Sequence, residues 1–210
     1  MPKYRTRDIR NIALVGHSGS GKTTLAEALL VQSGVKGEAG TVERGSTTMD
    51  YDPLERKFQH SLDSAIASLD YQGMHLNLID TAGIPDFRGP TLASLTAVET
   101  TAVVVNAQSG IELSTRRLMR RAKQRRVCRM IIINKIDIED LDLTQLINDL
   151  REEFGPECLP VNLPADNFGT VRDCFFHTEG DTDIFSLAEA HDAIIDQVVE
   201  VNEDLMEKYL

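Results

Sequence analysis

A short stretch near the start of the chain has the residue types and spacing that phosphate binding requires. Gly16 to Thr23 read G-H-S-G-S-G-K-T and fit the pattern G-x-x-x-x-G-K-[ST] of the phosphate-binding loop, or P-loop. Its glycines let backbone N–H groups turn inward, its lysine reaches the outer phosphates, and its last hydroxyl binds Mg²⁺. An apolar run (11–15) precedes it, and apolar residues at helical spacing (24–30) follow it. We therefore expect a strand-to-helix turn, with the side chain of Lys22 unpaired or open to solvent in the empty protein.

A second candidate for the same chemistry is Asp80-Thr81-Ala82-Gly83, at the end of an expected strand. Where a P-loop is present, an acidic residue in this place holds Mg²⁺, usually through water, and the glycine N–H can contact the γ-phosphate. D-x-x-G alone is common in plain turns. Its position after a P-loop and a hairpin favours the functional interpretation, which makes Thr23 and Asp80 the candidate metal ligands.

The third candidate is Asn134-Lys135-Ile136-Asp137, directly after the apolar run 130–133. N-K-x-D at a strand end is the guanine-recognition sequence of GTPases. Guanine offers N1–H and N2–H₂ as two donors on one edge, and a carboxylate accepts both at once. Adenine lacks this pair of donors and would leave the Asp137 carboxylate unpaired. A polar turn after a strand is the plain alternative.

The composition excludes several classes of function. The chain has 210 residues, 41% of them hydrophobic, and a net charge of −11, so we expect no binding to DNA through the surface as a whole. Three widely spaced cysteines, Cys128, Cys158 and Cys174, favour reduced thiols in a cytoplasmic protein. No apolar run approaches the roughly 18 residues of a membrane span, and residues 1–10 lack the apolar core of a secretory signal.

Strands and helices are expected to alternate along the chain. This order predicts an α/β fold with a mostly parallel sheet flanked by helices. Residues 33–64 are expected to form a long loop, and such loops are usually functional or mobile. The expected strands are 65–71 and 74–80, joined as a hairpin at Gln72-Gly73, then 102–107 and 130–133; the expected helices are 90–99, 114–126 and 141–154.

Two domains are expected from the change of pattern after residue 156. Residues 1–156 form the nucleotide-binding domain. Residues 157–210 break the rhythm with Pro and Gly residues and form the start of a small inserted subdomain. Within it we expect a β-like run at 171–177 and a long acidic helix at 187–209.

Together the three motifs resemble those of a known family. The order G-H-S-G-S-G-K-T, D-T-A-G-I-P-D-F, N-K-I-D resembles translational GTPases, most closely the atypical, elongation factor G-like branch of the elongation factor G family. The resemblance implies a P-loop GTPase fold, GTP or GDP with Mg²⁺ as cofactors, and hydrolysis of GTP to GDP and phosphate in a ribosome-linked step. The residues assigned to the nucleotide are Gly16, His17, Ser18, Gly19, Ser20, Gly21, Lys22, Thr23, Thr24, Asp80, Thr81, Ala82, Gly83, Asn134, Lys135 and Asp137.

Two alternatives stay open beside this assignment. Parts of the chain at 96–110 and 116–119 also resemble the class II peptide-release factor of the same superfamily. The other alternative is a GTP-dependent binding switch that scarcely hydrolyses its nucleotide.

Departures from the family pattern bear on catalysis. The family reads D-T-P-G-H-V-D-F, and the histidine that positions the attacking water is replaced here by Ile84. His60, in the long loop, is one candidate for its role, and the catalytic residue otherwise stays unassigned. The family's switch threonine, in R-G-I-T, falls on Gln59. Its candidate substitutes are Thr47, Thr48 and Ser61.

A fifth nucleotide motif, a Ser-Ala pair, is not found in the chain. We therefore expect the chain to end before this motif, as the N-terminal GTPase part of a larger protein.

A basic run at 116–129 stands out in an otherwise acidic chain. Arg116 and Arg120 lie at i, i+4 and put positive charge on one helix face, as do Arg117 and Arg121. Contact with ribosomal RNA or an acidic ribosomal protein is one interpretation, and pairing with the chain's own acidic helices is the other. The ribosome is the expected partner, through domains outside the chain and through Arg116, Arg120 and Arg121.

Overall fold

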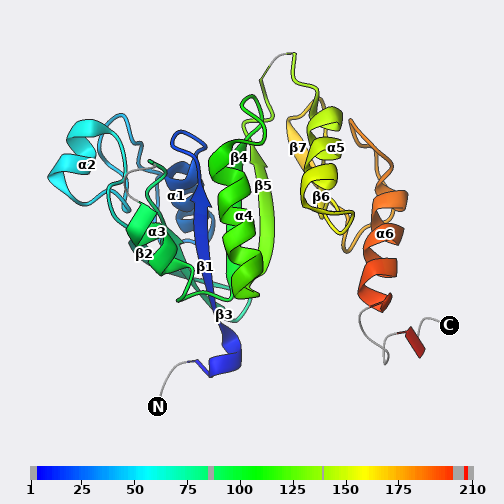
Figure 1. Cartoon of the computed structure of the whole chain (residues 1–210), viewed down its shortest axis with the longest axis horizontal. Helices are drawn as coiled ribbons and strands as arrows, with labels where there is room; N and C mark the ends of the chain where they lie inside the picture. Colours follow the sequence, from blue (N-terminus) through cyan, green and yellow to red (C-terminus); the bar gives the residue numbers. More distant parts are fainter. Residues whose placement is uncertain (1–3, 85–87, 139, 201–205, 208–210) are drawn as a thin grey trace. The chain divides into compact units, whose positions relative to one another are not determined.

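The computed structural model describes residues 4–84, 88–138, 140–200 and 206–207. It contains two compact units, residues 1–134 and 135–210, drawn in Figure 1 with colours that follow the sequence. The division falls directly after the last strand of the main sheet. It lies earlier than the division after residue 156 expected from sequence, because the helix at 143–154 groups with the second unit.

The first unit is built on a five-stranded sheet with the order β2-β3-β1-β4-β5 in the described part of the chain. Only β2 runs antiparallel to its neighbour, while β1, β3, β4 and β5 pair in parallel. In Figure 1, α4 lies in front of this sheet and α1 behind it, which confirms the expected fold class. The bounds are Thr6–Asp8 (η1), Ile9–Gly16 (β1), Lys22–Gln32 (α1), Pro53–Phe58 (α2), Ala65–Tyr71 (β2), Met74–Asp80 (β3), Arg88–Ser94 (α3), Thr100–Asn106 (β4), Leu113–Arg125 (α4) and Cys128–Asn134 (β5).

The centre of the sheet is covered on both faces. Residues 102–105 of β4 are each at most 1% exposed, and such a continuous apolar run is typical of a buried parallel strand. On one face, Ala26 and Leu30 of α1 join the core cluster. Met119 and Ala122 are the buried apolar residues that α4 contributes. The strand ends that carry the candidate motifs are therefore held by a packed core.

The hairpin between β2 and β3 is confirmed residue for residue. Tyr71 pairs with Met74, and Gln72 and Gly73 connect them. Their φ angles of 49° and 82° are both positive, as a type I′ turn requires, and this turn matches the twist of the paired strands.

The long loop at 33–64 contains a helix, α2, that the sequence analysis missed. Asp52 is its N-cap and accepts a 2.7 Å hydrogen bond from the N–H of Leu54. Pro53 takes the first helical position, and the carboxylate of Glu55 accepts a hydrogen bond from the N–H of Asp52, which completes a capping box. The signal D-P-L-E was therefore present in the sequence.

The helix expected at 90–99 is shorter, since α3 ends at Ser94. The hydroxyl of Thr96 donates to the carbonyl of Ala93 over 2.6 Å, and the N–H groups of Thr96 and Ala97 bond three residues back. These contacts close a turn in place of further α-helix.

The second unit contains α5 (Leu143–Phe154), an antiparallel hairpin of β6 (Asn162–Ala165) and β7 (Thr170–Asp173), and α6 (Leu187–Glu200). Its core includes Leu163, Cys174, Leu187 and Ile194.

Two expectations for the second unit need correction. β6 was not predicted from the sequence, and the strand expected at 171–177 ends at Asp173. It ends there because the carboxylate of Asp173 accepts the N–H groups of Phe175 and Phe176, at 2.8 and 2.7 Å, and turns the chain. The acidic helix expected at 187–209 is confirmed over 187–200, and residues 201–205 and 208–209 of it lie outside the described residues.

Among the helices of the described residues, none has the length and apolar character needed to cross a membrane. Cys128, Cys158 and Cys174 are all free thiols, as their odd number and wide spacing predicted.

Candidate functional site

The P-loop sequence forms the expected turn between β1 and α1. β1 ends at Gly16 and α1 begins at Lys22. A Cβ on Gly16 would lie 2.3 Å from the carbonyl oxygen of Val104 in β4, so only glycine fits against this neighbouring strand. Gly21 is the N-cap of α1 and has a left-handed φ of 95°. The loop therefore presents the N-terminus of α1, where free N–H groups and the helix dipole favour an anion.

Lys22 is buried in this loop, whereas the sequence analysis expected it to face solvent. Its Nζ donates to the carbonyl oxygens of His17, at 2.9 Å, and Gly16, at 3.2 Å, and the residue is 6% exposed. Burial lowers the pKa of Lys22, and the carboxylates of Asp80 and Glu112 oppose that shift. The lysine is thus held by two backbone carbonyls of its own loop.

Thr23 and Asp80 meet at the base of the loop. The hydroxyl of Thr23 donates to Oδ2 of Asp80 over 2.6 Å. Asp80 is 1% exposed, and its Oδ1 is buried without a hydrogen-bond partner in the described structure. Burial, together with the nearby Asp50 carboxylate, outweighs the bond from Thr23 and the charge of Lys22 and raises the pKa of Asp80 to about 6. A buried carboxylate oxygen without a donor is the arrangement that a cation or its bound water would satisfy.

Two residues of the long loop extend this pair. The hydroxyl of Ser61 lies 3.4 Å from that of Thr23 and donates to Oδ1 of Asp50 over 2.8 Å. The other oxygen of Asp50 accepts from the hydroxyl of Thr47, also at 2.8 Å. Of the three substitutes considered for the switch threonine, Ser61 is the one whose hydroxyl lies next to Thr23. Asp50 was not singled out from the sequence, because its connection to Thr23 runs through Ser61 and depends on the folding of the loop.

The segment after β3 packs directly on the P-loop. A Cβ on Gly83 would lie 2.6 Å from Nζ of Lys22 and 2.6 Å from the backbone nitrogen of Ser18, so only glycine allows this approach. The hydroxyl of Thr81 donates to the carbonyl of Leu14 over 2.9 Å and fixes the segment to β1. The structure thus brings the first two sequence motifs into contact.

The third motif is connected to the P-loop through its first residue. Nδ2 of Asn134 donates to the carbonyl of Ser20 over 2.9 Å, and it fills the space beside Gly21 that a Cβ would need. Lys135 and Asp137 follow in the second unit and are both exposed. Lys135 has a φ of 62°, the left-handed conformation that marks the turn after β5.

The histidines of interest take different positions. His17 lies between Glu112, 3.5 Å from its Nε2, and the hydroxyl of Ser114, 3.4 Å from its Nδ1. It therefore joins the P-loop to the start of α4. His60 is exposed, directly before Ser61.

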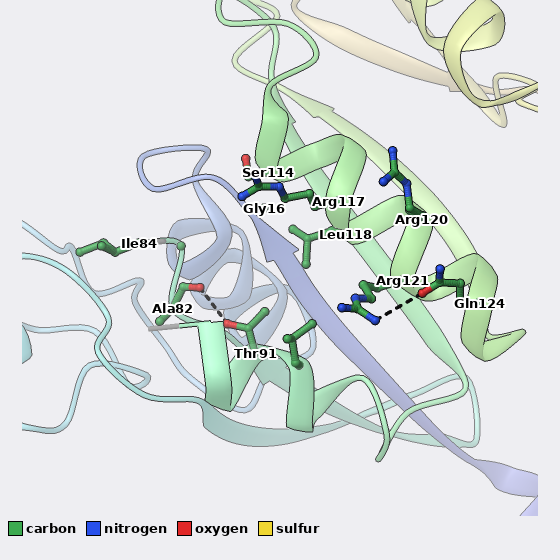
Figure 2. Close-up of a pocket in the computed structure, with 12 residues that line it drawn as sticks. Gly16, Ala82, Ile84, Thr91, Ser114, Arg117, Leu118, Arg120, Arg121 and Gln124 are labelled. Carbon is green, nitrogen blue, oxygen red and sulfur yellow. Dashed lines mark hydrogen bonds between the residues drawn. The ribbon is translucent and has the colours of Figure 1, made fainter. Parts of the chain in front are cut away.

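A cavity of about 440 Å³ lies beside the P-loop, between α3 and α4. Figure 2 shows Ile84 extending away from the arginines of α4, while Thr91 of α3 donates to the carbonyl of Ala82 over 3.0 Å. An isoleucine has no hydrogen-bonding group, so this position offers nothing that could orient water. The polar wall of the cavity comes from α4 and consists of Ser114, Arg117, Arg120, Arg121 and Gln124.

The basic face of α4 is exposed, as expected. Arg116, Arg120 and Arg121 all have exposed side chains. Arg116 donates to the carbonyl of Ile111, and Arg121 donates to Gln124, both at 3.4 Å.

Comparison with known proteins agrees with this architecture. The family model of the elongation factor Tu GTP binding domain matches residues 7–208, so the chain belongs to this family of P-loop domains. An elongation factor G-like protein of Mycobacterium tuberculosis is 35% identical over 96% of this chain and 30% of its own length. One of Thermotoga maritima is 32% identical over 97% of this chain and 31% of its own length.

Two further relatives extend the comparison. Peptide chain release factor 3 of Limosilactobacillus reuteri is 33% identical over 80% of this chain and 33% of its own length. A crystal structure of a Thermus thermophilus protein superimposes with a TM-score of 0.83 at 33% identity, over 96% of this chain and 33% of that one. The chain thus spans about a third of the length of the relatives it matches.

Proposed function

We propose that this chain is the GTP-binding domain of an elongation factor G-like translation factor and that it binds GTP and GDP together with Mg²⁺. One observation carries the proposal. A P-loop lies directly above a buried carboxylate, Asp80, whose Oδ2 is bound by Thr23 and whose Oδ1 has no partner in the described structure. This pairing of a phosphate cradle with an incomplete carboxylate–hydroxyl site fits a nucleotide whose phosphates carry a divalent cation.

The proposed metal ligands are Thr23, directly, and Asp80, directly or through water, with Ser61 and Asp50 close by. Mg²⁺ supplies neutralisation of the phosphate charge that develops during phosphoryl transfer. The described residues contain no group of three or more His, Cys, Asp and Glu side chains placed to hold a metal. Mg²⁺ does not require such a group, because it keeps several waters and shares its remaining positions with substrate phosphates.

The P-loop residues would bind the phosphates. The N–H groups between Gly16 and Thr24 face the anion, and the ammonium of Lys22 exchanges the carbonyls of Gly16 and His17 for phosphate oxygens. The lysine is already on the correct side of the loop, so little conformational entropy is lost when the exchange occurs. The N–H of Gly83 is the donor proposed for the γ-phosphate.

Guanine recognition is assigned to the third motif. Asp137 accepts both donors of the guanine edge, the stem of Lys135 packs on the base, and Asn134 fixes the turn to Ser20 of the P-loop.

We propose slow GTP hydrolysis by the isolated chain, with stimulation on the ribosome when the whole protein is present. Ile84 supports the rival function, a GTP-dependent switch with little hydrolysis. The basic face at Arg116, Arg120 and Arg121 is the proposed ribosomal contact in this chain. A peptide-release role is the less favoured alternative, since the elongation factor G-like relatives match more of the chain.

Calorimetry with GDP, a slowly hydrolysed GTP analogue and ATP tests the proposal. Both guanine nucleotides are expected to bind more tightly with Mg²⁺ than with EDTA, and ATP is expected to bind at least 100-fold more weakly. Thr23→Ala is expected to remove the Mg²⁺ response, while Thr96→Ala, in a turn away from the loop, leaves it intact. ATP binding as tight as that of GDP contradicts the assignment.

A further inference from the structure

Glu27 is a charged side chain buried completely inside the first unit. It lies in α1, is 0% exposed, and accepts three groups from the loop that follows this helix. Its Oε2 accepts from Nζ of Lys36 at 2.6 Å and from the N–H of Gly40 at 2.8 Å, and its Oε1 accepts from the N–H of Thr48. A buried carboxylate is stable only when it is paired in this way.

The ionised form of Glu27 is strongly favoured by these partners. Burial alone would raise its pKa, but the Lys36 ammonium and the N–H groups of Thr48 and Gly40 hold the pKa at about 2. Lys36 also donates to the hydroxyl of Thr48 at 3.1 Å, so the ion pair itself bridges two parts of the loop. Three residues of the loop thus bind the single negative charge of Glu27.

Contacts within the loop hold residues 40 to 46 in a compact turn beside Glu27. A Cβ on Gly40 would lie 2.1 Å from the carbonyl oxygen of Ser46, so the loop backbone packs against itself at these two residues. Ser46 also accepts the N–H of Thr41 on its hydroxyl, at 3.0 Å. Residues 36–48 therefore form a closed segment, and the N–H groups of Gly40 and Thr48 are turned towards Glu27 of α1.

The far end of this segment leads to the proposed metal site. Thr48, held by Glu27, follows Thr47, whose hydroxyl donates to Asp50 at 2.8 Å. Asp50 in turn accepts from Ser61, which lies 3.4 Å from Thr23. Thr23 and Glu27 stand four residues apart on the same face of α1, so one rigid helix carries both the metal ligand and the anchor of the loop.

We propose that Glu27 is a positioning residue, whose carboxylate latches residues 36–48 onto α1 and thereby holds Asp50 and Ser61 at the Mg²⁺ site. The inference rests on the proposed binding of nucleotide with Mg²⁺. Glu27 itself touches neither nucleotide nor metal in this role. Without the latch, the P-loop still binds phosphate, but the loop no longer delivers its oxygens to the cation.

Amide hydrogen exchange of the nucleotide-free chain tests the latch itself. In Glu27→Gln one of the two acceptor oxygens becomes an NH₂ donor, so the side chain cannot accept from Thr48 on one side and from Lys36 and Gly40 on the other. The N–H groups of Gly40 and Thr48 are therefore expected to exchange at least tenfold faster than in the wild type. Lys36→Met keeps the carboxylate and both N–H bonds, so the exchange of the Gly40 and Thr48 N–H groups is expected to become only about threefold faster. Glu38→Gln makes the same charge change at an exposed position of the loop and is the matched control, with wild-type exchange.

Magnesium titration of a bound fluorescent GTP analogue that resists hydrolysis tests the positioning role. Glu27→Gln is expected to raise the Mg²⁺ concentration for half-maximal slowing of analogue release at least tenfold, and to leave affinity in EDTA within twofold of wild type. A purely structural role would instead lower the melting temperature without moving the Mg²⁺ midpoint. Lys36→Met is expected to shift the midpoint in the same direction by a smaller factor, and it serves if Glu27→Gln does not fold.

The outcomes separate the two proposals. No binding of guanine nucleotide by the wild-type chain would overturn the proposed function and the role of Glu27 with it. Binding that responds to Mg²⁺ equally in wild type, Glu27→Gln and Lys36→Met would overturn the positioning role alone. Unchanged exchange of Gly40 and Thr48 in both variants would overturn the latch.

Discussion

Nζ of Lys22 donates to the carbonyl oxygen of His17, 2.9 Å away, so the lysine of the phosphate-binding loop is bonded to the loop itself. The same ammonium donates to Gly16 and is nearly buried. The ammonium therefore lies within the loop that is proposed to bind phosphate, and its two hydrogen bonds also contribute to the structure of that loop.

Replacement of this lysine should therefore affect binding far more than stability. Lys22→Ala is expected to weaken GDP binding at least 100-fold, because a charge-assisted bond to phosphate is lost. The two lost hydrogen bonds and the relief of a buried charge oppose each other, so the unfolding free energy should change by about 1 kcal/mol or less. Calorimetry and urea denaturation measure the two effects. Lys123→Ala, exposed on α4, is the control with unchanged affinity, and near-wild-type GDP affinity of Lys22→Ala would refute the P-loop assignment.

The base specificity depends on Asp137. Asp137→Asn replaces one acceptor oxygen with a donor, which suits xanthine, because xanthine carries an acceptor where guanine has an amine. GDP affinity is expected to fall at least 100-fold while xanthosine diphosphate affinity rises, as competition binding would show. Exposed Asp140→Asn, three residues further on, is the matched control. Retention of the wild-type preference for GDP in Asp137→Asn would show that another residue reads the base.

The acid–base behaviour of Asp80 gives a pH dependence of known sign. Its pKa is raised from 3.8 to about 6 in the folded chain, so the folded state binds the proton more tightly than the unfolded state. The stability that neutral Asp80 contributes is fully present below about pH 4 and is lost as the pH rises to about 6. The loss is on the order of 2 to 3 kcal/mol.

The variant Asp80→Asn isolates this effect from other titrating groups. Measured in EDTA without nucleotide, the difference in unfolding free energy between wild type and Asp80→Asn should change across pH 4 to 6 and be flat above it. Glu27 does not interfere, because the stability from its lowered pKa of about 2, which is lost as the pH falls below its ordinary value of 4.5, is present in both proteins and cancels in the difference. A difference that is flat across pH 4 to 6 would show that Asp80 is not desolvated as described.

Local sequence signals predicted much of the fold. The strand before Gly16, the helix after it and the hairpin turn at Gln72-Gly73 all follow from patterns within a few residues. The missed helix α2 had such a signal in its capping box, which the charged surroundings of residues 33–64 concealed.

The features that sequence did not predict depend on contacts between distant residues. Glu27 resembles a solvated helix residue until the N–H of Thr48, 21 residues away, is folded onto it. Asp50 becomes part of the proposed metal site only because Ser61, which donates to it, lies next to Thr23. The burial of Lys22 likewise arises from the backbone path of the loop, which residue types do not specify. The position of the long loop against α1 and the P-loop is thus the feature that could not be predicted from the sequence.

Ile84 stands where the family resemblance predicts a histidine. A positioned acid–base or orienting group typically contributes about 10² to 10⁴ in rate. The isolated wild-type chain is therefore expected to hydrolyse GTP at or below the intrinsic rate of small GTPases, roughly 10⁻⁴ per second. Single-turnover release of phosphate measures this rate directly.

Ile84→His and His60→Ala decide which residue, if any, orients the water. If the lack of a histidine is the main defect, Ile84→His should raise ribosome-stimulated hydrolysis by the whole protein and leave GTP affinity unchanged, since the substitution adds an orienting group without touching the P-loop. His60→Ala should then have little effect. The reverse pattern, with an active wild type and severe loss in His60→Ala, would assign the role to the loop that also carries Ser61. Fast hydrolysis that neither substitution alters would contradict both assignments, because the water must then be oriented by a group outside these two positions.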